Sequence, residues 1–373
     1  MLYHFLTPYA RDFIAFNLFN YISFRAAGAA ATAVLLAFVV GPALIGVLHR
    51  RGVGQIVRTD GPASHQGKRG TPTMGGLIIL LCTVVPTLLW AQLDNRYVLV
   101  ALVATLWMGT IGFIDDYLKV VQEKPRGLVA RHKLVGQVTF GIVLGSYLAW
   151  QPLNDTLPAT ATTVPFFKYV IVVFAPLIYV AFVTFILTGT SNAVNLTDGL
   201  DGLAIGLSVI AAGTFALFAY LFGRVDASEY LRTFYLRGAG ELTVFCAALM
   251  GAGIGFLWFN AHPAQVFMGD TGSLAIGGAF GTIAILLKAE FLLLMVGGVF
   301  VAETLSVIIQ TSVFKWHRRR RGREYAEQHR VFRMAPLHHH FEKIGWPESK
   351  VVMRFYIVGL LCALFALSSL KVR

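Results

Sequence analysis

The sequence predicts an all-α polytopic membrane protein. Hydrophobic residues make up 56% of the 373 residues and charged residues only 13%, whereas soluble domains carry about 25% charged residues. The mean hydropathy is +0.67. Apolar stretches long enough to cross about 30 Å of hydrocarbon recur along the whole chain. Because no polar tract of domain size separates them, residues 1–373 are predicted to form one integral membrane domain.

Ten apolar stretches are candidates for transmembrane helices. Polar clusters separate all of them except the eighth and ninth, which only Lys288 to Glu290 divide, so these two could instead be one segment. The ten stretches are 24–48, 73–91, 97–114, 134–150, 168–188, 202–222, 242–259, 273–288, 290–314 and 351–370.

The distribution of Lys and Arg predicts the orientation. Loops after odd-numbered stretches hold 20 of them: five in 49–72, five in 115–133 and ten in 315–350. Loops after even-numbered stretches hold only 6. Since basic loops stay in the cytoplasm, both termini are predicted to be periplasmic. The net charge of +12 therefore reflects topology, and we expect no nucleic-acid partner.

Five aspartates lie in loops on the predicted cytoplasmic face: Asp115, Asp116, Asp198, Asp201 and Asp270. An aspartate in mid-membrane costs about 2.5–3.5 kcal/mol, so these side chains should line a hydrated cleft at the membrane surface. They could merely solvate helix ends. The loops around Asp198 and Asp270 are rich in Gly and lack Lys and Arg, which favours a binding site.

Two of these loops have features of a phosphate and metal site. In Asn192–Gly202 the acids Asp198 and Asp201 are spaced i, i+3, which would place them on one helix face. In Phe267–Ser273 the glycines beside Asp270 allow close backbone approach to a ligand. Both segments lead into apolar stretches, and helix N-termini favour phosphate. Carboxylates repel phosphate unless a divalent cation bridges them, so Mg²⁺ is the predicted cofactor.

Basic and histidine side chains are predicted on the same face. Lys68 and Lys133 flank apolar stretches, where a lysine is often only a topology anchor. The last cytoplasmic loop contains His338, His339 and His340. Neighbouring residues on a helix point about 100° apart, so the three cannot ligate one ion. We expect one or two of them to hydrogen-bond phosphate or sugar.

Glu303 is an acid placed well inside an apolar stretch. It is interpreted either as a buried, neutral, hydrogen-bonded helix residue or as part of a lipid groove. The two interpretations differ in whether its side chain faces other helices or lipid.

Five segments in this order resemble the phospho-N-acetylmuramoyl-pentapeptide-transferase family, within the polyprenyl-phosphate N-acetylhexosamine-1-phosphate transferases. They are Lys68–Gly76, Ile111–Tyr117, Asn192–Gly202, Phe267–Ser273 and Pro336–Glu342. The resemblance covers essentially the whole chain. It implies transfer of phospho-MurNAc-pentapeptide from UDP-MurNAc-pentapeptide to undecaprenyl phosphate, with Mg²⁺, giving lipid I and UMP. It also implies a homodimer in the bacterial inner membrane.

The resemblance further implies roles for individual residues. Asp115 and Asp116 match the catalytic pair, Asp270 matches the catalytic metal ligand, and His338 matches a further catalytic position. Phe267 matches the residue that stacks on uracil. Asn192, Asn195, Asp198 and Asn260 match the rest of the nucleoside pocket, and Lys68, Thr73, Lys133, Gln310, His339 and His340 match other substrate-binding positions.

The chemistry leaves two routes open. One acid could deprotonate the lipid phosphate for direct attack on the β-phosphate, or it could itself attack and form a covalent intermediate. The direct route with Asp115 as base is favoured, because the adjacent Asp116 and a metal would crowd an adduct.

Two other functions compete with this prediction. A related enzyme could transfer GlcNAc-1-phosphate to the same lipid, and the three histidines speak for the muramoyl branch by resemblance only. A transporter would be expected to show paired repeats and mid-membrane charges. No long internal repeat is visible, and the five aspartates lie at one edge.

Overall fold

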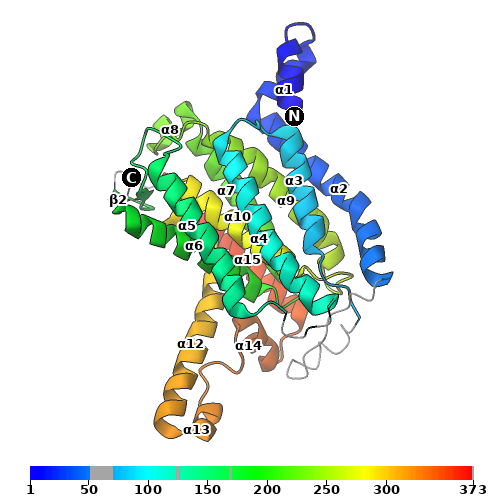
Figure 1. Cartoon of the computed structure of the whole chain (residues 1–373), viewed down its shortest axis with the longest axis vertical. Coiled ribbons are helices and arrows are strands. Elements are labelled where there is room, and N and C mark those ends of the chain that lie inside the picture. Colours follow the sequence, from blue (N-terminus) through cyan, green and yellow to red (C-terminus); the bar gives the residue numbers. More distant parts are fainter. Residues whose placement is uncertain (51–69, 123, 125–126, 168–169, 372–373) are drawn as a thin grey trace.

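The computed structural model describes residues 1–50, 70–122, 124, 127–167 and 170–371. Within them the chain is almost entirely helical, and long helices run side by side as a bundle (Figure 1). The elements in chain order are α1 (Leu2–Leu6), η1 (Thr7–Tyr9), η2 (Ile14–Asn20), α2 (Ile22–Arg50), α3 (Gly76–Trp90), α4 (Arg96–Val120), α5 (Ala130–Trp150), β1 (Ala161–Thr163), β2 (Ile171–Val173), α6 (Pro176–Thr197), α7 (Leu203–Phe222), α8 (Val225–Leu231), η4 (Ala239–Glu241), α9 (Leu242–Asn260), α10 (Gly269–Leu286), α11 (Glu290–Val296), α12 (Gly298–Arg321), α13 (Arg323–Gln328), α14 (Leu337–Ile344) and α15 (Glu348–Ser368).

The predicted polytopic membrane fold is confirmed, although the number of helices that qualify as spans is smaller than ten. In the described part of the chain, eight helices are long and apolar enough to cross a membrane: α2, α4, α6, α7, α9, α10, α12 and α15. The apolar helix α3 has only 15 residues. The helix α5 opens with the charged and polar segment 130–133, which dilutes its apolar character.

Three boundaries predicted from the sequence are wrong. The stretch 97–114 was ended too early, because α4 continues to Val120 and therefore carries Asp115 and Asp116 on a helix and not in a loop. Within the stretch 168–188, residues 171–173 form a strand that pairs antiparallel with 161–163, and the helix begins only at Pro176. The stretch 290–314 is split into α11 and α12 at Gly297. The predicted division between the eighth and ninth stretches is present, since α10 ends at Leu286 and α11 begins at Glu290.

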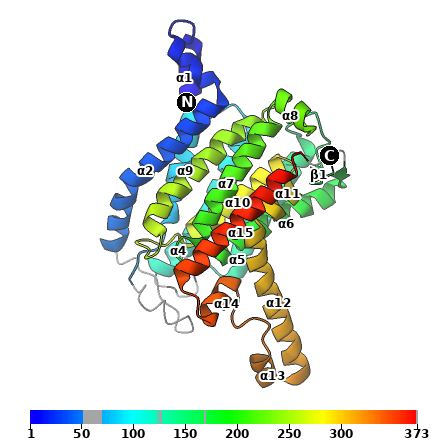
Figure 2. The same ribbon diagram turned by 180° about the vertical axis from the view of Figure 1, so that it is seen from behind.

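Helix α10 occupies the centre of the bundle, and every residue from Thr271 to Leu286 is buried (Figures 1 and 2). Glycines let its neighbours approach closely. A Cβ on Gly112 of α4 would lie 2.1 Å from the Asp270 carbonyl oxygen, and one on Gly76 of α3 would lie 2.1 Å from the Gly272 nitrogen. Small residues commonly allow such backbone approach where lipid gives helices no hydrophobic reason to associate. This packing brings the ends of α3, α4 and α10 together.

The two ends of the bundle differ in what they carry. The helix α1 and the last turn of α15 lie at one end, whereas α14 and the protruding α12–α13 pair lie at the other (Figures 1 and 2). Both termini are therefore on the same side, as the orientation prediction requires. Which side faces the cytoplasm stays a prediction from the charge count.

Candidate active site

The candidate site forms where the last turns of α4 meet the first turn of α10. Hydrogen bonds tie the segment before α3 to the loop before α10: Phe267 N–H donates to Pro72 O, and Gly75 N–H donates to Phe267 O, both at 2.8 Å. Gly269, with φ of +73°, takes a left-handed conformation that glycine adopts without strain. This turn directs Asp270 towards α4.

Asp116 binds the N-terminus of α10 from the neighbouring helix. Its Oδ1 accepts the Asp270 N–H at 3.1 Å, and its Oδ2 accepts the N–H and hydroxyl of Thr271 at 2.8 and 2.6 Å. The residue is only 3% exposed. A carboxylate at this position satisfies amide groups that a helix start leaves without intrahelical partners. Asp116 therefore holds Asp270 in place as well as contributing charge.

Two lysines bridge the other two acids. Lys119 Nζ lies 2.6 Å from Asp115 Oδ2 and 2.8 Å from Asp270 Oδ2. Lys133 Nζ lies 3.0 and 2.7 Å from the same two oxygens. Asp115 comes from α4, Asp270 from α10 and Lys133 from α5, so the ion pairs join three helices. We call Asp115, Asp116, Asp270, Lys119 and Lys133 the acid–lysine cluster.

The remaining carboxylate oxygens of the cluster also accept hydrogen bonds. Leu128 N–H donates to Asp115 Oδ1 at 2.6 Å. Asn195 Nδ2 donates to Asp270 Oδ1 at 2.5 Å and to Ser273 Oγ at 2.8 Å. These contacts orient the acids, and they place the predicted substrate residue Asn195 directly beside the predicted metal ligand.

The donor atoms suit a hard divalent cation. One oxygen each from Asp115, Asp116 and Asp270 lies within 4.8 Å of the other two. The cluster holds three carboxylates and two ammonium groups, and because the lysines pair only with Asp115 and Asp270, no lysine balances the charge of Asp116. Mg²⁺ prefers oxygen ligands and usually binds one or two carboxylates together with substrate phosphates. The residues present therefore fit a magnesium–phosphate site.

Asp198 and Asp201 do not share a helix face, so the interpretation from their i, i+3 spacing is wrong. Asp198 ends α6 with ψ of 54°, and residues 198–202 form a turn before α7. Asp201 instead contacts His262 and the Ala264 N–H. Burial raises the pKa of Asp198 well above its usual range, and the nearby carboxylates of Asp270 and Asp116 raise it further.

Other predicted pocket residues surround this centre. Thr73 is buried, and its Oγ1 would lie 3.0 Å from a Cβ built on Gly269. Phe267 is half-buried in the loop before α10. Asn260 is buried and supports that loop: its Oδ1 accepts the Gly202 N–H at 3.1 Å and its Nδ2 donates to Val266 O at 2.8 Å. Asn192 lies against α5, where its Nδ2 donates to Gln137 Oε1 at 2.9 Å.

The histidines of α14 have separate partners. His338 is fully buried with its Nδ1 3.2 Å from Glu303 Oε1, and its Nε2 would lie 2.2 Å from a Cβ on Gly199. His339 Nδ1 lies 2.8 Å from Glu342 Oε2. His340 Nδ1 accepts the Arg333 N–H at 3.1 Å. His338 thus contacts the turn that carries Asp198. Glu303 is buried and accepts the His338 N–H at 3.2 Å, so its side chain faces another helix and not lipid.

The structure does not gather all predicted residues into the cluster. Gln310 of α12 exchanges two hydrogen bonds with the Phe332 backbone, at 3.1 and 3.0 Å, and so supports the loop before α14. Lys68 lies outside the described residues. Conversely, Lys119 was not predicted as a site residue, although its i, i+4 spacing from Asp115 on one helix is a signal that could have identified it.

Comparison with known proteins identifies the family. Residues 98–288 match glycosyl transferase family 4, and residues 68–80 match phospho-N-acetylmuramoyl-pentapeptide-transferase signature 1. Over 100% of both chains, the sequence is 64% identical to the phospho-N-acetylmuramoyl-pentapeptide-transferase of Gemmatimonas aurantiaca, 50% to that of Geobacter sp. and 49% to that of Citrifermentans bemidjiense. The chain is therefore a multi-pass membrane transferase that belongs to the phospho-N-acetylmuramoyl-pentapeptide-transferase family.

Proposed function

We propose that this chain transfers phospho-N-acetylmuramoyl-pentapeptide from its UDP carrier to undecaprenyl phosphate, forming lipid I and UMP. The observation that carries the proposal is the acid–lysine cluster at one end of an apolar helical bundle. A polyprenyl chain could stay in lipid against the exposed apolar side chains while its phosphate reaches Lys119 and Lys133. The names of the relatives supply the identity of the sugar nucleotide.

The proposed reaction is a direct displacement. A phosphate oxygen of the lipid attacks the β-phosphorus of the sugar nucleotide, and the bond from that phosphorus to the oxygen bridging the α-phosphate breaks, so UMP leaves. Lys119 and Lys133 offset negative charge on the phosphates, which is the main demand of such transfers. Asp115 accepts the proton of a monoanionic lipid phosphate. The adjacent Asp116 would crowd a covalent adduct on Asp115, which favours the direct route.

We propose Mg²⁺ as the cofactor, held by Asp270 together with Asp115 and Asp116. When bound, the ion would neutralise diphosphate charge and let phosphate approach these carboxylates. The uracil is proposed to stack on Phe267, with Asp198 and Asn195 nearby. Phe267→Ala should then weaken nucleotide binding by roughly five- to 150-fold, the range expected for one base–aromatic stack.

The deciding experiment follows radiolabel into undecaprenyl phosphate from UDP-MurNAc-pentapeptide and, separately, from UDP-GlcNAc. Transfer from the muramoyl donor with release of UMP supports the proposal. Transfer from UDP-GlcNAc alone would assign the chain to the related hexosamine branch. If neither donor supports transfer and vesicles containing the protein take up a solute, the chain would be assigned as a transporter and not as an enzyme.

We also propose a location in the bacterial inner membrane, with the acid–lysine cluster on the cytoplasmic side and two chains per assembly. The four arginines at the end of α12, Arg318–Arg321, support this orientation. A single cysteine introduced there, on a cysteine-free background, should resist membrane-impermeant thiol reagents in intact cells. Labelling of this cysteine from outside the cell would show that the proposed orientation is wrong. The homodimer rests on the family resemblance and is tested by cross-linking in membranes.

A further inference from the structure

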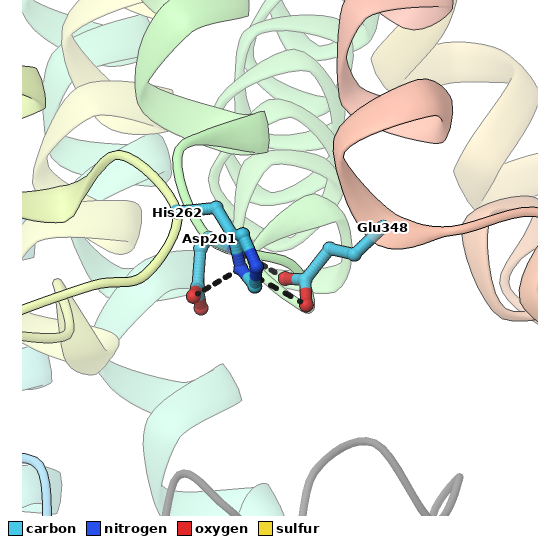
Figure 3. A group of neighbouring side chains, drawn as sticks. All are labelled: Asp201, His262 and Glu348. Atoms are coloured by element: carbon cyan, nitrogen blue, oxygen red, sulfur yellow. Dashed lines mark hydrogen bonds and ion pairs between the residues drawn. The ribbon is translucent and has the colours of Figure 1, made fainter.

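A second group of ionisable side chains joins three elements beside the candidate nucleotide pocket. Asp201 lies in the turn before α7, His262 in the loop between α9 and α10, and Glu348 at the first position of α15 (Figure 3). His262 Nδ1 lies 3.2 Å from Asp201 Oδ2 and 3.6 Å from Glu348 Oε2. We call these three residues the loop latch.

The two acids of the latch are held from several directions. The Asp201 and Glu348 side chains are 3% and 6% exposed. Asp201 N–H donates to Glu348 Oε1 at 2.7 Å, and Ala264 N–H donates to Asp201 Oδ2 at 3.1 Å. Because carboxylates only accept hydrogen bonds, the His262 nitrogen that faces Asp201 must carry a hydrogen. The imidazole therefore hydrogen-bonds Asp201, and Glu348 is tied to the same turn through the Asp201 N–H.

The loop latch holds the two segments that carry residues predicted to bind the nucleotide. Asp201 is three residues after Asp198 in the same turn, and His262 is five residues before Phe267 in the same loop. Asn260 joins the same two segments through the Gly202 N–H and Val266 O, and the Tyr356 hydroxyl donates to Gly202 O at 2.7 Å. The distance between Asp198 and Phe267 therefore depends on these contacts.

We infer that Asp201, His262 and Glu348 are positioning residues that set the spacing between Phe267 and Asp198, and thereby the affinity for the uridine nucleotide. This inference rests on the proposed function for the identity of the ligand. None of the three belongs to the acid–lysine cluster, so the latch affects nucleotide binding and not the transfer step.

His262 is the best position to test, because its side chain is 47% exposed and its replacement leaves no buried cavity. The comparison uses full-length His262→Ala, His262→Asn and, as matched control, Gln265→Ala, an exposed residue of the same loop. Asparagine places an amide N–H near the Nδ1 position. The measurements are the Kd for UMP, steady-state kinetics with both substrates, thermal unfolding and amide hydrogen exchange of residues 261–268.

His262→Ala should raise the Kd for UMP and the KM for UDP-MurNAc-pentapeptide about tenfold, as expected for loss of a hydrogen bond to a charged group. The kcat and the KM for undecaprenyl phosphate should change less than about twofold, because the acid–lysine cluster is untouched. Exchange of 261–268 should accelerate, since the Ala264 amide loses a fixed acceptor. His262→Asn should recover most of the affinity, and Gln265→Ala should behave as the wild type.

Several results would contradict the inference. In His262→Ala these are an unchanged Kd for UMP, an unchanged hydrogen-exchange rate of residues 261–268, or a parallel loss of kcat, of the affinity for both substrates and of thermal stability. Failure of His262→Asn to recover the affinity for UMP would contradict it as well. Copurification of one transition-metal ion per chain that His262→Ala loses would also overturn it, by making the group a metal site. If wild-type protein transfers nothing, the proposed function fails on that control alone. Amide hydrogen exchange would still test the inference in that case, because the measurement requires no substrate.

Discussion

Two groups of opposite charges lie at opposite ends of the bundle, and they differ in charge balance and in exposure to solvent. At the end near α1, Arg25 and Glu241 form a two-pronged pair with distances of 2.6 and 2.5 Å, and their side chains are 0% and 4% exposed. Gln92 N–H donates to Glu241 Oε2 at 3.1 Å. One positive charge meets one negative charge, and the pair joins α2 to the segment before α9.

The acid–lysine cluster at the other end is neither balanced nor closed. Its two ammonium groups pair with Asp115 and Asp270, whereas Asp116 binds the start of α10 and has no lysine partner. Lys119 and Asp270 are 37% and 15% exposed. Water and solutes can therefore reach a site with excess negative charge. The Arg25–Glu241 pair, whose charges balance and are enclosed, serves the structure. The acid–lysine cluster, with an excess of negative charge and access to solvent, keeps the capacity to bind a cation and phosphate.

The largest effect is expected from Asp270→Asn, which keeps the shape of the side chain and removes the charge proposed to hold Mg²⁺. We expect kcat to fall by more than about 10³-fold, as for loss of a central electrostatic group, with little change in thermal unfolding. UMP release by purified protein provides the measurement. Asp155→Asn, an exposed acid in the loop after α5, is the control and should be nearly neutral. Full activity of the wild type in excess EDTA would contradict the metal proposal.

A large effect on stability, without one on catalysis, is expected from Arg25→Met. It leaves Glu241 buried without its cation, which should cost about 3–5 kcal/mol of unfolding free energy. Thermal or denaturant unfolding in detergent measures this loss. The double variant Arg25→Met with Glu241→Leu should recover most of it, because no unpaired charge is then buried. A fall in kcat of the folded protein, at unchanged stability, would show that the pair belongs to the active site.

A smaller effect is expected from Lys119→Met. Lys133 still bridges Asp115 and Asp270, but the cluster gains one unit of negative charge. We expect kcat to fall roughly ten- to 100-fold because one phosphate-neutralising group is lost. The Mg²⁺ concentration for half-maximal activity should fall as well, since a more negative site attracts the cation. Lys124→Met, an exposed lysine just after α4, is the matched control. An unchanged Mg²⁺ requirement would show that Lys119 does not share the metal site.

The sequence by itself was sufficient for the membrane fold and for the most important acids. Long apolar stretches exclude a soluble fold, because helices must satisfy their backbone hydrogen bonds in lipid. Burying a charged side chain in hydrocarbon is also unfavourable, so aspartates are rare in mid-membrane. Asp115, Asp116 and Asp270 could therefore be assigned to one membrane surface from the sequence. Helix ends were less certain, as the hairpin before Pro176 shows, because short strand pairing leaves no long periodic pattern.

Only the tertiary structure decided which side chains meet. Lys133 reaches Asp270 across 137 positions of sequence, and Arg25 reaches Glu241 across 216. Asp198 and Asp201, three positions apart, point to different sites because a turn separates them. Hydrophobicity and local spacing determine which segments become helices. Contacts between helices depend on how their surfaces pack, here on glycines that allow α4 and α3 to touch the start of α10, and no local pattern encodes those distances.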